Sequence, residues 1–329
     1  MKKVLVLGAT GFLGRHVVSQ LQQEDVLVVA ASRHPSKQQE SKVQNIALDC
    51  SDESALRSVM TDVDCVINCV AGDAQTLVAA TQALVNVINP LSSIRVVHIS
   101  SMAVYGAVTG LISEDTPLAT DAGWYAQAKS ETEKMWIDHR AKGGQVVILR
   151  PGCIYGVDSE QWVTRIARLL SAGRIGDLGV LGDGFTNLVH VSDVVQAIIA
   201  SMNKPDSFSD TFNLAAQPAT RWNEYFISLA VAIGATPVRR VSKRQLMLDA
   251  KLLSVGLKVL ELILRKLKIK TSKLPEIMPP SLLRLWQQDI RLDASKAEKV
   301  LNIKWVTFDD GIKNCADWLK SHHKLIKTA

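Results

Sequence analysis

Tyr125 and Lys129 are the two residues whose types and spacing most directly indicate proton chemistry. They stand four positions apart, at the start of a helical pattern that continues through Glu133 and Trp136. A spacing of four places both side chains on one face of a helix. A nearby ammonium stabilises a phenolate and lowers the pKa of the tyrosine. The pair therefore predicts a Tyr125 hydroxyl that can donate or accept a proton near neutral pH.

Ser101 is the third residue that can take part in this chemistry. It follows an apolar strand pattern over 94–99 that ends in two serines, Ser100 and Ser101. A hydroxyl at that point can hydrogen-bond a reacting oxygen and orient it. Because a Tyr and a Lys four apart are common by chance, the catalytic interpretation depends on the elements that surround them.

The first of these elements is a strand, a glycine-rich turn and a helix. Apolar residues 4–7 run into three glycines at a spacing of three, and a helical pattern begins after the third glycine. The first glycine can adopt a backbone conformation that a Cβ penalises, the second lets the backbone approach a pyrophosphate, and the third lets helix and strand pack closely. Free N–H groups and the helix dipole favour a diphosphate there. The predicted cofactor contacts are Gly8, Thr10, Gly11, Phe12, Leu13 and Gly14.

The second strand pattern, over 26–31, is followed by Ser32 and Arg33. In dinucleotide folds an acidic residue at this point binds the adenosine ribose, whereas an arginine accommodates a 2′-phosphate. The sequence has no Asp or Glu here, so we favour NADP(H) over NAD(H), with Ser32 and Arg33 as contacts. The alternative interpretation of Arg33 is a solvated side chain in the loop that ends the strand.

Further strand patterns alternate with helical patterns along the first hundred residues. The strand patterns cover 43–48, 64–70 and 94–99, and the helical patterns cover 54–60 and 74–88. This alternation argues for right-handed parallel crossovers. In such a sheet Asp49 and Cys50 lie near the adenine ring, and the small residues after the next strand let the cofactor pass close to the backbone at Val70 and Ala71.

Several ordered motifs resemble the extended short-chain dehydrogenase/reductases, the NAD-dependent epimerase/dehydratase superfamily. The matching segments are GATGFLG (8–14), SSMAVYG (100–106), YAQAK (125–129), LRPGCIYG (149–156), GDG with VHVSDV (182–194), TFNLA (211–215) and DASKA (293–297). The resemblance covers nearly all of the chain. It implies that Ser101, Tyr125 and Lys129 are the catalytic set, with Ser101 chosen over Ser100 because it stands four residues before Tyr105.

The resemblance also indicates how the cofactor and substrate are held. It implies that the backbone from Pro151 to Cys153 touches the nicotinamide. Lys129 can hold the nicotinamide ribose, and both Tyr125 and Lys129 are expected to contact the cofactor. Nucleotide-sugar enzymes of the family often have Asn where this chain has Cys153, and Arg near the pair at 187–188, which here is Asn-Leu. The chain therefore looks more like the 3β-hydroxysteroid dehydrogenase and dihydroflavonol reductase side.

The expected fold class is α/β, a Rossmann-type doubly wound parallel sheet with a smaller C-terminal substrate lobe. Residues 1–154 are expected to form the dinucleotide-binding domain, its sheet completed by segments near 186–215, and the lobe comprises 155–185 and 216–329. Within the last part of the sheet domain, we expect His190 to be a hydrogen-bonded core residue. Asp193 is expected to cap a helix over 194–201.

Composition narrows the class of protein. Five cysteines without a CxxC pair and scattered histidines predict reduced thiols, no metal site and a cytoplasmic protein. No apolar run is long enough to span a bilayer. Residues 239–273 hold eleven Lys/Arg against Asp249 and Glu261, a net charge of +9, so the rest of the chain carries −3 of the total of +6. Because the basic charge belongs to one segment without interleaved aromatics, nucleic-acid binding is not expected.

Part of that basic segment, 251–270, has apolar and charged residues on opposite sides of a helix. We favour a helix of the substrate lobe whose apolar stripe packs on the core or the ligand. The alternative is peripheral membrane contact, for which a basic face beside an apolar face is typical, and a lipidic substrate would make the two compatible. A homodimer through helices flanking Tyr125 is implied by family analogy alone.

These observations predict an enzyme, an NADP(H)-dependent oxidoreductase that interconverts a ketone or aldehyde and an alcohol on an apolar or amphipathic small molecule. Tyr125 would donate or accept the proton and Ser101 would orient the substrate oxygen. One alternative is a nucleotide-sugar epimerase or dehydratase with a retained NAD. Another is a cofactor-binding subunit without turnover.

Overall fold

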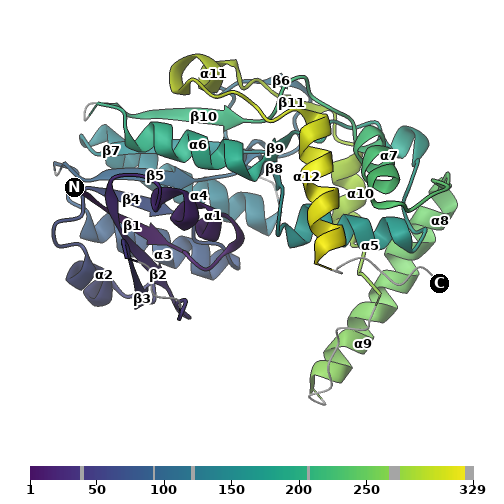
Figure 1. Ribbon diagram of the computed structural model, residues 1–329, viewed down its shortest axis with the longest axis horizontal. Coiled ribbons are helices and arrows are strands. Elements are labelled where there is room, and N and C mark those ends of the chain that lie inside the picture. Colours follow the sequence, from purple (N-terminus) through teal and green to yellow (C-terminus); the bar gives the residue numbers. More distant parts are fainter. Residues whose placement is uncertain (38–40, 92, 120–122, 206–207, 267–274, 323–329) are drawn as a thin grey trace. The chain divides into compact units, whose positions relative to one another are not determined.

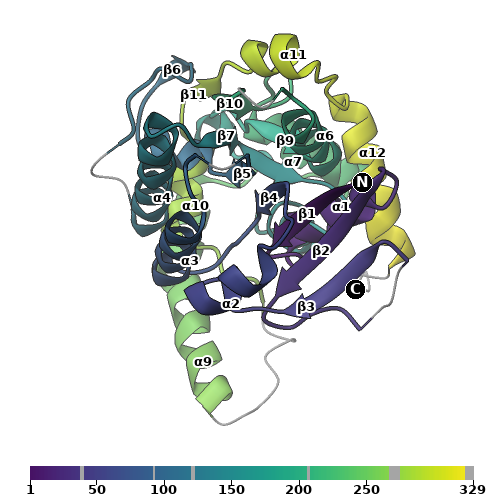
Figure 2. The ribbon, with the colours of Figure 1, turned by 90° about the vertical axis from the view of Figure 1, so that its left-hand side faces the viewer.

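Seven parallel strands form the central sheet of the computed structural model (Figures 1 and 2). They are β1 (Lys2–Leu7), β2 (Val26–Ser32), β3 (Val43–Ala47), β4 (Cys65–Asn68), β5 (Arg95–Ile99), β7 (Gln145–Pro151) and β10 (Asp210–Leu214). Their order across the sheet is β10-β7-β5-β4-β1-β2-β3. The chain builds outward on one side of β1 and then crosses to the other side, so the predicted doubly wound Rossmann-type sheet is confirmed.

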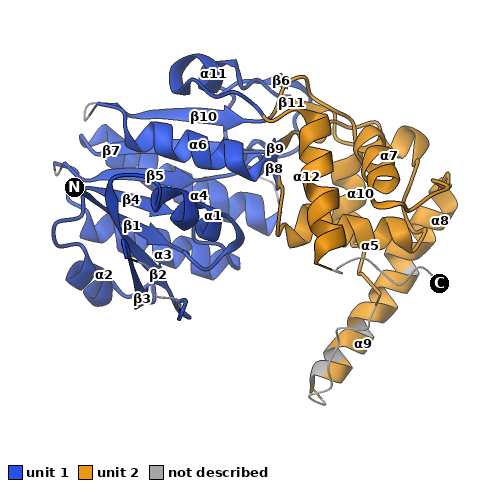
Figure 3. Cartoon of the chain, in the orientation of Figure 1, with its two compact units in different colours: residues 1–154, 189–215, 292–305 blue, residues 155–188, 216–291, 306–329 orange. Residues whose placement is uncertain are grey.

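The structure describes residues 1–37, 41–91, 93–119, 123–205, 208–266 and 275–322. They fall into two compact units (Figure 3). Unit 1 comprises 1–154, 189–215 and 292–305, and unit 2 comprises 155–188, 216–291 and 306–329.

Unit 1 has three layers, with helices on both faces of the sheet. Helices α1 (Phe12–Leu21), α6 (Val191–Met202) and α11 (Ser295–Leu301) share one apolar core with the sheet, and α2 (Glu53–Val59), α3 (Ala74–Val87) and α4 (Trp124–Ala141) share the other. Alternate residues of a strand face opposite sides, so Val4 and Val6 of β1 enter the first core while Leu5 and Leu7 enter the second. Both faces of the sheet are therefore buried, as a parallel sheet requires.

Unit 2 is mostly helical. Its helices are α5 (Arg165–Ser171), α7 (Trp222–Ile233), α8 (Lys243–Leu248), α9 (Ser254–Lys266), α10 (Pro280–Trp286) and α12 (Phe308–Ser321), with short helical turns η2 (Glu160–Thr164), η3 (Gly179–Gly182) and η4 (Asp249–Leu253). Its core contains an aromatic cluster in which Trp222 contacts Tyr225, Phe226 and Trp286. The remaining short elements of the chain are η1 (Met102–Tyr105), β6 (Gly110–Ile112), β8 (Cys153–Tyr155), β9 (Leu188–His190) and β11 (Ile290–Leu292).

Residues 292–305 differ from the sequence prediction, which assigned them to the smaller lobe. They belong to unit 1. The reason is that Ala297, Leu301 and Ile303 enter the core under α6 and β10. An apolar stripe at the end of the chain does not say which core it will enter, so the sequence pattern could not make this assignment.

Two predicted helices have different boundaries. Helix α6 begins at Val191, not at 194, because the ring of His190 accepts the N–H of Ser192 at 3.3 Å and caps the helix. Asp193 is therefore buried inside the first turn and is not the cap. The predicted helix over 251–270 consists of η4 and α9, and 267–270 lie outside the described residues.

All five cysteines are free thiols, as predicted, and Cys50 is half-buried while the other four are buried. Within the described ranges, no helix is long and apolar enough to cross a membrane.

The turn after β1 is packed too closely for side chains. Gly8 has a φ of +73°, and a Cβ there would stand 2.7 Å from the carbonyl oxygen of Cys69. A Cβ on Gly14 would collide with the carbonyl oxygen of Gly8 and stand 2.9 Å from the Cα of Ala9. These contacts are the tight turn and the close packing of helix on strand that the glycine spacing predicts.

Gly14→Ala should therefore lower the free energy of unfolding by about 1–3 kcal/mol, the usual effect of overpacking. Gly256→Ala is the matched control, since Gly256 also lies in a helix but a Cβ there has no neighbour within 4 Å. The control should gain about 0.5–1 kcal/mol from helix propensity. Urea denaturation of both variants measures the difference, and a Gly14→Ala protein as stable as the parent would contradict the close packing.

Candidate active site

The predicted site residues lie at the carboxyl ends of the parallel strands of unit 1. Gly8 follows β1, Ser32 ends β2 and Ser101 follows β5. In open parallel sheets, ligands bind at this edge, where the strand order reverses. Here the reversal lies between β1 and β4, and the glycine turn packs against Cys69, the residue after β4. The fold thus brings together residues that are far apart in the sequence.

The start of helix α1 offers backbone groups to a ligand. Gly11 is the N-cap and supplies no side-chain hydrogen bond. Leu13 directs its side chain into the core, so a contact by Leu13 with a phosphate would come from its N–H. The carbonyl of Thr10 accepts a hydrogen bond from Arg15 at 2.9 Å. This end of α1 therefore fits the predicted role in binding a diphosphate.

Ser32 gives a second observation that fits a nucleotide at this edge. The residue is 6% exposed, and within the described part of the chain its Oγ has no hydrogen-bond partner. Buried hydroxyls without a partner are rare and call for an explanation. A ribose or phosphate oxygen would satisfy this one.

Arg33 is exposed and lies within electrostatic range of two carboxylates. The N–H and hydroxyl of Ser51 lower the pKa of Asp49, and Arg33 adds to the shift. Thr76 lowers the pKa of Asp73 in the same way, again with a contribution from Arg33. The guanidinium of Arg33 is therefore near enough to the loops after β3 and β4 to act electrostatically on both carboxylates.

Three further predicted cofactor contacts adjoin the glycine turn or the end of β4. Burial raises the pKa of Cys50 to about 11, while the N–H of Gly8 acts on its sulfur in the opposite direction. Cys50 therefore lies beside the turn. The N–H of Val70 donates to Oδ1 of Asn68 at 3.2 Å, and Ala71 is exposed. Their contacts with a cofactor remain predictions.

The side chains of Ser101 and Cys153 both act on the pKa of Tyr125, Ser101 lowering it and Cys153 raising it, so the three side chains lie near one another. Ser101 Oγ also accepts the N–H of Ala103 at 3.2 Å. Although 40% of the surface of Tyr125 is exposed, burial of its hydroxyl end raises the pKa of Tyr125, against the opposing effect of Ser101. The predicted lowering of this pKa is therefore wrong for the protein alone, because desolvation outweighs stabilisation of the phenolate.

Lys129 is buried on the same helix, α4, one turn after Tyr125. It is 5% exposed, and its Nζ donates to the carbonyl of Ile99 at 2.7 Å. Burial lowers the pKa of Lys129 to about 8, although Cys69 and Glu133 favour the charged form. The spacing of four correctly predicted a shared helix, α4, but the ammonium is directed at the end of β5.

A buried polar network fixes α4 on the sheet, and the sequence analysis did not identify it. Glu133 accepts hydrogen bonds from Ser100 Oγ at 2.6 Å and from Arg150 Nε at 2.9 Å. Arg150 also donates to the Tyr105 hydroxyl at 2.8 Å, which donates to Asn213 at 2.6 Å. The signal was present, since Glu133 continues the four-residue spacing of Tyr125 and Lys129, and an arginine in a buried strand requires a partner.

The last two predicted cofactor contacts, Pro151 and Cys153, lie at the end of β7 and at the start of β8. Pro151 ends the strand, and the N–H of the next residue, Gly152, donates to the carbonyl of Leu214 at 2.9 Å. Cys153 is buried, and burial raises its pKa. Its thiol is therefore protonated and presents a weakly polar surface to the Tyr125 hydroxyl.

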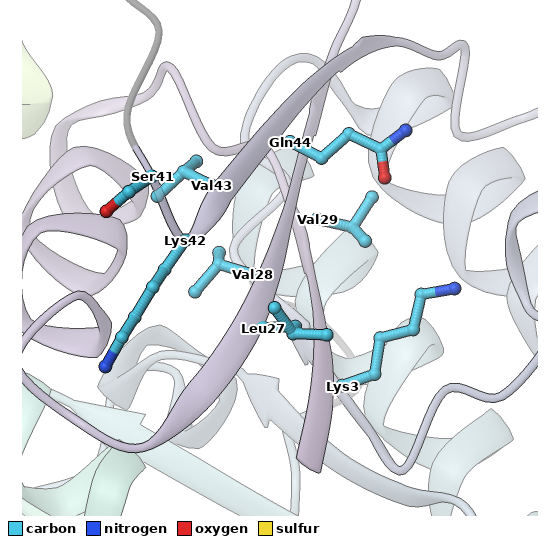
Figure 4. Close-up of a pocket in the computed structure, with 8 residues that line it drawn as sticks. All are labelled: Lys3, Leu27, Val28, Val29, Ser41, Lys42, Val43 and Gln44. Atoms are coloured by element: carbon cyan, nitrogen blue, oxygen red, sulfur yellow. The ribbon is translucent and has the colours of Figure 1, made fainter. Parts of the chain in front are cut away.

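A pocket elsewhere in unit 1 is not part of this site. It is lined by Lys3, Leu27, Val28, Val29, Ser41, Lys42, Val43 and Gln44 (Figure 4). These residues come from the first halves of β1, β2 and β3 and from the loop before β3. They lie toward the amino ends of the strands, opposite the edge that carries Ser101 and the glycine turn.

Comparison with known proteins identifies sequence and fold relatives. The profile of the NAD dependent epimerase/dehydratase family matches residues 4–215. A dTDP-4-dehydro-6-deoxy-D-allose reductase from a Streptomyces species is 28% identical over 232 residues, 60% of this chain and 71% of that protein. A decarboxylating sterol-4-alpha-carboxylate 3-dehydrogenase from Dictyostelium discoideum is 23% identical over 250 residues, 69% of this chain and 75% of that protein.

Solved structures share the fold across the whole chain. The crystal structure of dTDP-glucose 4,6-dehydratase from Bacillus anthracis, in complex with NAD, superposes with a TM-score of 0.75 at 17% identity. The similarity covers 98% of this chain and 98% of that one.

The buried ammonium of Lys129 should give the protein a distinct pH dependence. Its folded pKa of about 8 lies below the ordinary value of 10.5, so between these values the unfolded chain keeps a proton that the folded chain has released. Stability contributed by this group therefore rises with pH across that window, by about 3 kcal/mol in total. Denaturation at a series of pH values should show this contribution in the parent protein and not in Lys129→Met.

Lys134→Met, which removes an exposed lysine of the same helix, is the control and should keep the parent profile. If Lys129→Met and the parent change equally between pH 8 and 10.5, the pKa of Lys129 is not lowered.

Proposed function

Because this chain belongs to the NAD-dependent epimerase/dehydratase family, we propose that it is an NADP(H)-dependent oxidoreductase that interconverts a ketone or aldehyde and an alcohol on an apolar or amphipathic small molecule. The observation that carries the proposal is that the hydroxyl of Ser101 lies close enough to the hydroxyl of Tyr125 to lower its pKa, at the carboxyl edge of the sheet. A pair of hydroxyls can hold one substrate oxygen and transfer a proton to it.

The residues at this edge fit a dinucleotide. The glycine turn leaves no room for a Cβ at Gly8 or Gly14, and the Ser32 hydroxyl is buried without a partner among the described residues. Close approach of the backbone and an open helix start suit the pyrophosphate. When bound, the nicotinamide supplies or accepts the hydride.

Tyr125 is the proton donor in the direction of reduction. Its raised pKa keeps the hydroxyl protonated at neutral pH, so it can donate to a carbonyl oxygen. Ser101 donates a second hydrogen bond to that oxygen and orients it. Lys129 has three N–H donors, of which one is directed at Ile99, and another would hold the nicotinamide ribose when the cofactor is bound. Its ammonium also stabilises the negative charge that builds up on the Tyr125 oxygen during transfer.

The preference for NADP(H) rests on charge at the end of β2. Ser32 and Arg33 occupy the place where an acidic residue would repel a 2′-phosphate. The electrostatic effect of Arg33 on Asp49 and Asp73 supports a place for its positive charge at this edge. A phosphate with two negative charges competes with those single carboxylates for the guanidinium.

The substrate class rests on the neighbours of the Tyr125 hydroxyl. The Cys153 thiol beside it is kept neutral by burial. The ring of Trp124, which is 59% exposed, meets Tyr125 edge-on with centroids 5.7 Å apart. A neutral thiol and an exposed indole favour an apolar or amphipathic substrate.

The second candidate is a nucleotide-sugar epimerase or dehydratase that retains NAD. The name of the Bacillus dehydratase favours it, and the name of the Streptomyces reductase favours a nucleotide-sugar substrate without favouring redox-neutral chemistry. Incubation of the protein with nucleotide-sugars distinguishes the two candidates. A nucleotide-sugar that is converted without net oxidation of NADPH, by protein that retains NAD through purification, would replace our proposal.

The cofactor preference can be tested by calorimetric titration with NADPH and with NADH. Arg33→Glu should weaken NADPH binding about 10–100-fold, because a charge-assisted contact is lost, and should leave NADH binding nearly unchanged. Arg57→Glu, the same charge reversal on exposed helix α2, is the control and should affect neither. Equal weakening of both coenzymes by Arg33→Glu, or tighter binding of NADH to the parent, would contradict the assignment.

The proton-transfer role can be tested by Tyr125→Phe. Oxidation of NADPH with a panel of aryl and alkyl ketones should fall about 10²–10⁴-fold, the usual contribution of a general acid, while the Kd for NADPH stays close to that of the parent. Tyr225→Phe is the matched control, because the Tyr225 hydroxyl donates to the carbonyl of Trp162 inside unit 2. Turnover that is unchanged in Tyr125→Phe would remove Tyr125 from the mechanism.

A further inference from the structure

The helical segment from Leu248 to Lys266 has an apolar surface that faces solvent. Among the described residues, fifteen large hydrophobic residues are exposed, and five of them lie in this segment. They are Leu248 (58% exposed), Leu253 (49%), Val255 (53%), Leu260 (42%) and Ile263 (51%). Isolated exposed hydrophobic residues are ordinary, but a contiguous group marks a surface that another body covers.

The first half of the segment is fastened to unit 2. Arg174 Nε donates to Oδ2 of Asp249 at 2.7 Å, and the N–H of Met278 donates to Ser254 Oγ at 2.9 Å. Ala250 and Leu257 are buried on the same side. The first half of the segment, from Asp249 to Leu257, therefore packs on the core of unit 2.

The second half of α9 extends beyond that core (Figures 1 and 3). After Leu257, no residue of α9 that the structure describes is buried, and Leu260 and Ile263 are exposed. An isolated helical end is marginal in water, and exposed leucine and isoleucine make it less favourable still. The sequence analysis expected the apolar stripe to pack on the core or on the ligand, and Leu260 and Ile263 do not pack on the core.

The same segment is basic, with four Lys/Arg against Asp249 and Glu261, a net charge of +2, and it lies within a longer basic stretch. Residues 239–273 have a net charge of +9, whereas the rest has −3. Lys251, Lys258 and Lys266 are exposed on the helix, and Lys258 pairs with Glu261 at 2.9 Å. A helix is about 10 Å across. The distance from these lysines to a surface that the apolar side chains contact is therefore about one Debye length or less.

We propose that α9 docks this protein on an anionic lipid surface. Leu253, Leu260 and Ile263 would enter the boundary between headgroups and acyl chains, and the lysines would extend their aliphatic stems and place their ammonium groups among the phosphates. Charge decides between this occupant and a second copy of the chain. Two copies of α9 would bring two basic segments together, whereas an anionic surface neutralises one. The inference does not depend on the proposed function, since none of its residues belongs to the candidate active site.

Cosedimentation of the full chain with vesicles tests this surface. Binding should be strong on phosphatidylcholine mixed with phosphatidylglycerol, weak on phosphatidylcholine alone, and should decline as salt is added. The double variant Leu260→Gln with Ile263→Gln should weaken binding to the mixed vesicles by on the order of tenfold for each side chain removed from the apolar phase. The matched control is Ile227→Gln with Val231→Gln, a pair exposed on α7 of the same unit, which should bind as the parent does.

A second variant keeps the test independent of the apolar side chains. Lys251→Glu with Lys266→Glu should weaken binding to the mixed vesicles by at least about fivefold per lysine and reduce the salt dependence. No binding to the mixed vesicles at low salt, or equal binding to both kinds of vesicle, would overturn the proposal. So would sedimentation analysis that shows a dimer in the parent and a monomer in the Leu260→Gln, Ile263→Gln variant, because a second copy would then be the occupant.

Discussion

An ion pair buried away from water, between Glu133 and Arg150, holds the candidate active site in place. Such a pair is stable only when its remaining hydrogen-bonding groups are also satisfied, and here Ser100, Tyr105 and the carbonyl of Glu114 complete it. Glu133 lies one helical turn beyond Lys129 on α4, so the pair sets the rotation of that helix against β5 and β7. The direction of both Tyr125 and Lys129 follows from it.

Burial is the largest influence on the pKa values of Tyr125 and Lys129. Elementary reasoning from the spacing of Tyr125 and Lys129 predicts mutual stabilisation of a phenolate and an ammonium. In the folded protein both groups are desolvated, which raises the pKa of Tyr125 and lowers the pKa of Lys129 to about 8. Both groups are therefore biased toward their neutral forms. The site holds its proton on the tyrosine, which suits donation better than abstraction.

Local patterns predicted much of the fold because strands such as β1, β2 and β5 are apolar runs that end at a glycine or a serine. The glycine turn was predictable in detail, since Gly8 and Gly14 serve steric needs that only glycine meets. Non-local facts were not predictable. Helix α11 packs against β10 and the core through Ala297 and Leu301. The spacing of Glu133 and the burial of Arg150 each signal a partner, but the sequence does not say that the two residues meet. His190 capped α6 in place of Asp193 because an imidazole nitrogen can also accept an N–H.

The discontinuity of unit 1 bears on how the protein is made. Its sheet includes β10 at one edge, and its core includes α11 at 295–301. A chain that emerges from the ribosome in order can pair β1 to β5 early, yet α11 cannot cover its side of β10 until residues 295–301 have been synthesised. Until then, the apolar side chains on that face of the edge strand β10 are exposed to water and to other chains. Aggregation during synthesis, more than instability of the finished protein, is thus the hazard that this topology creates.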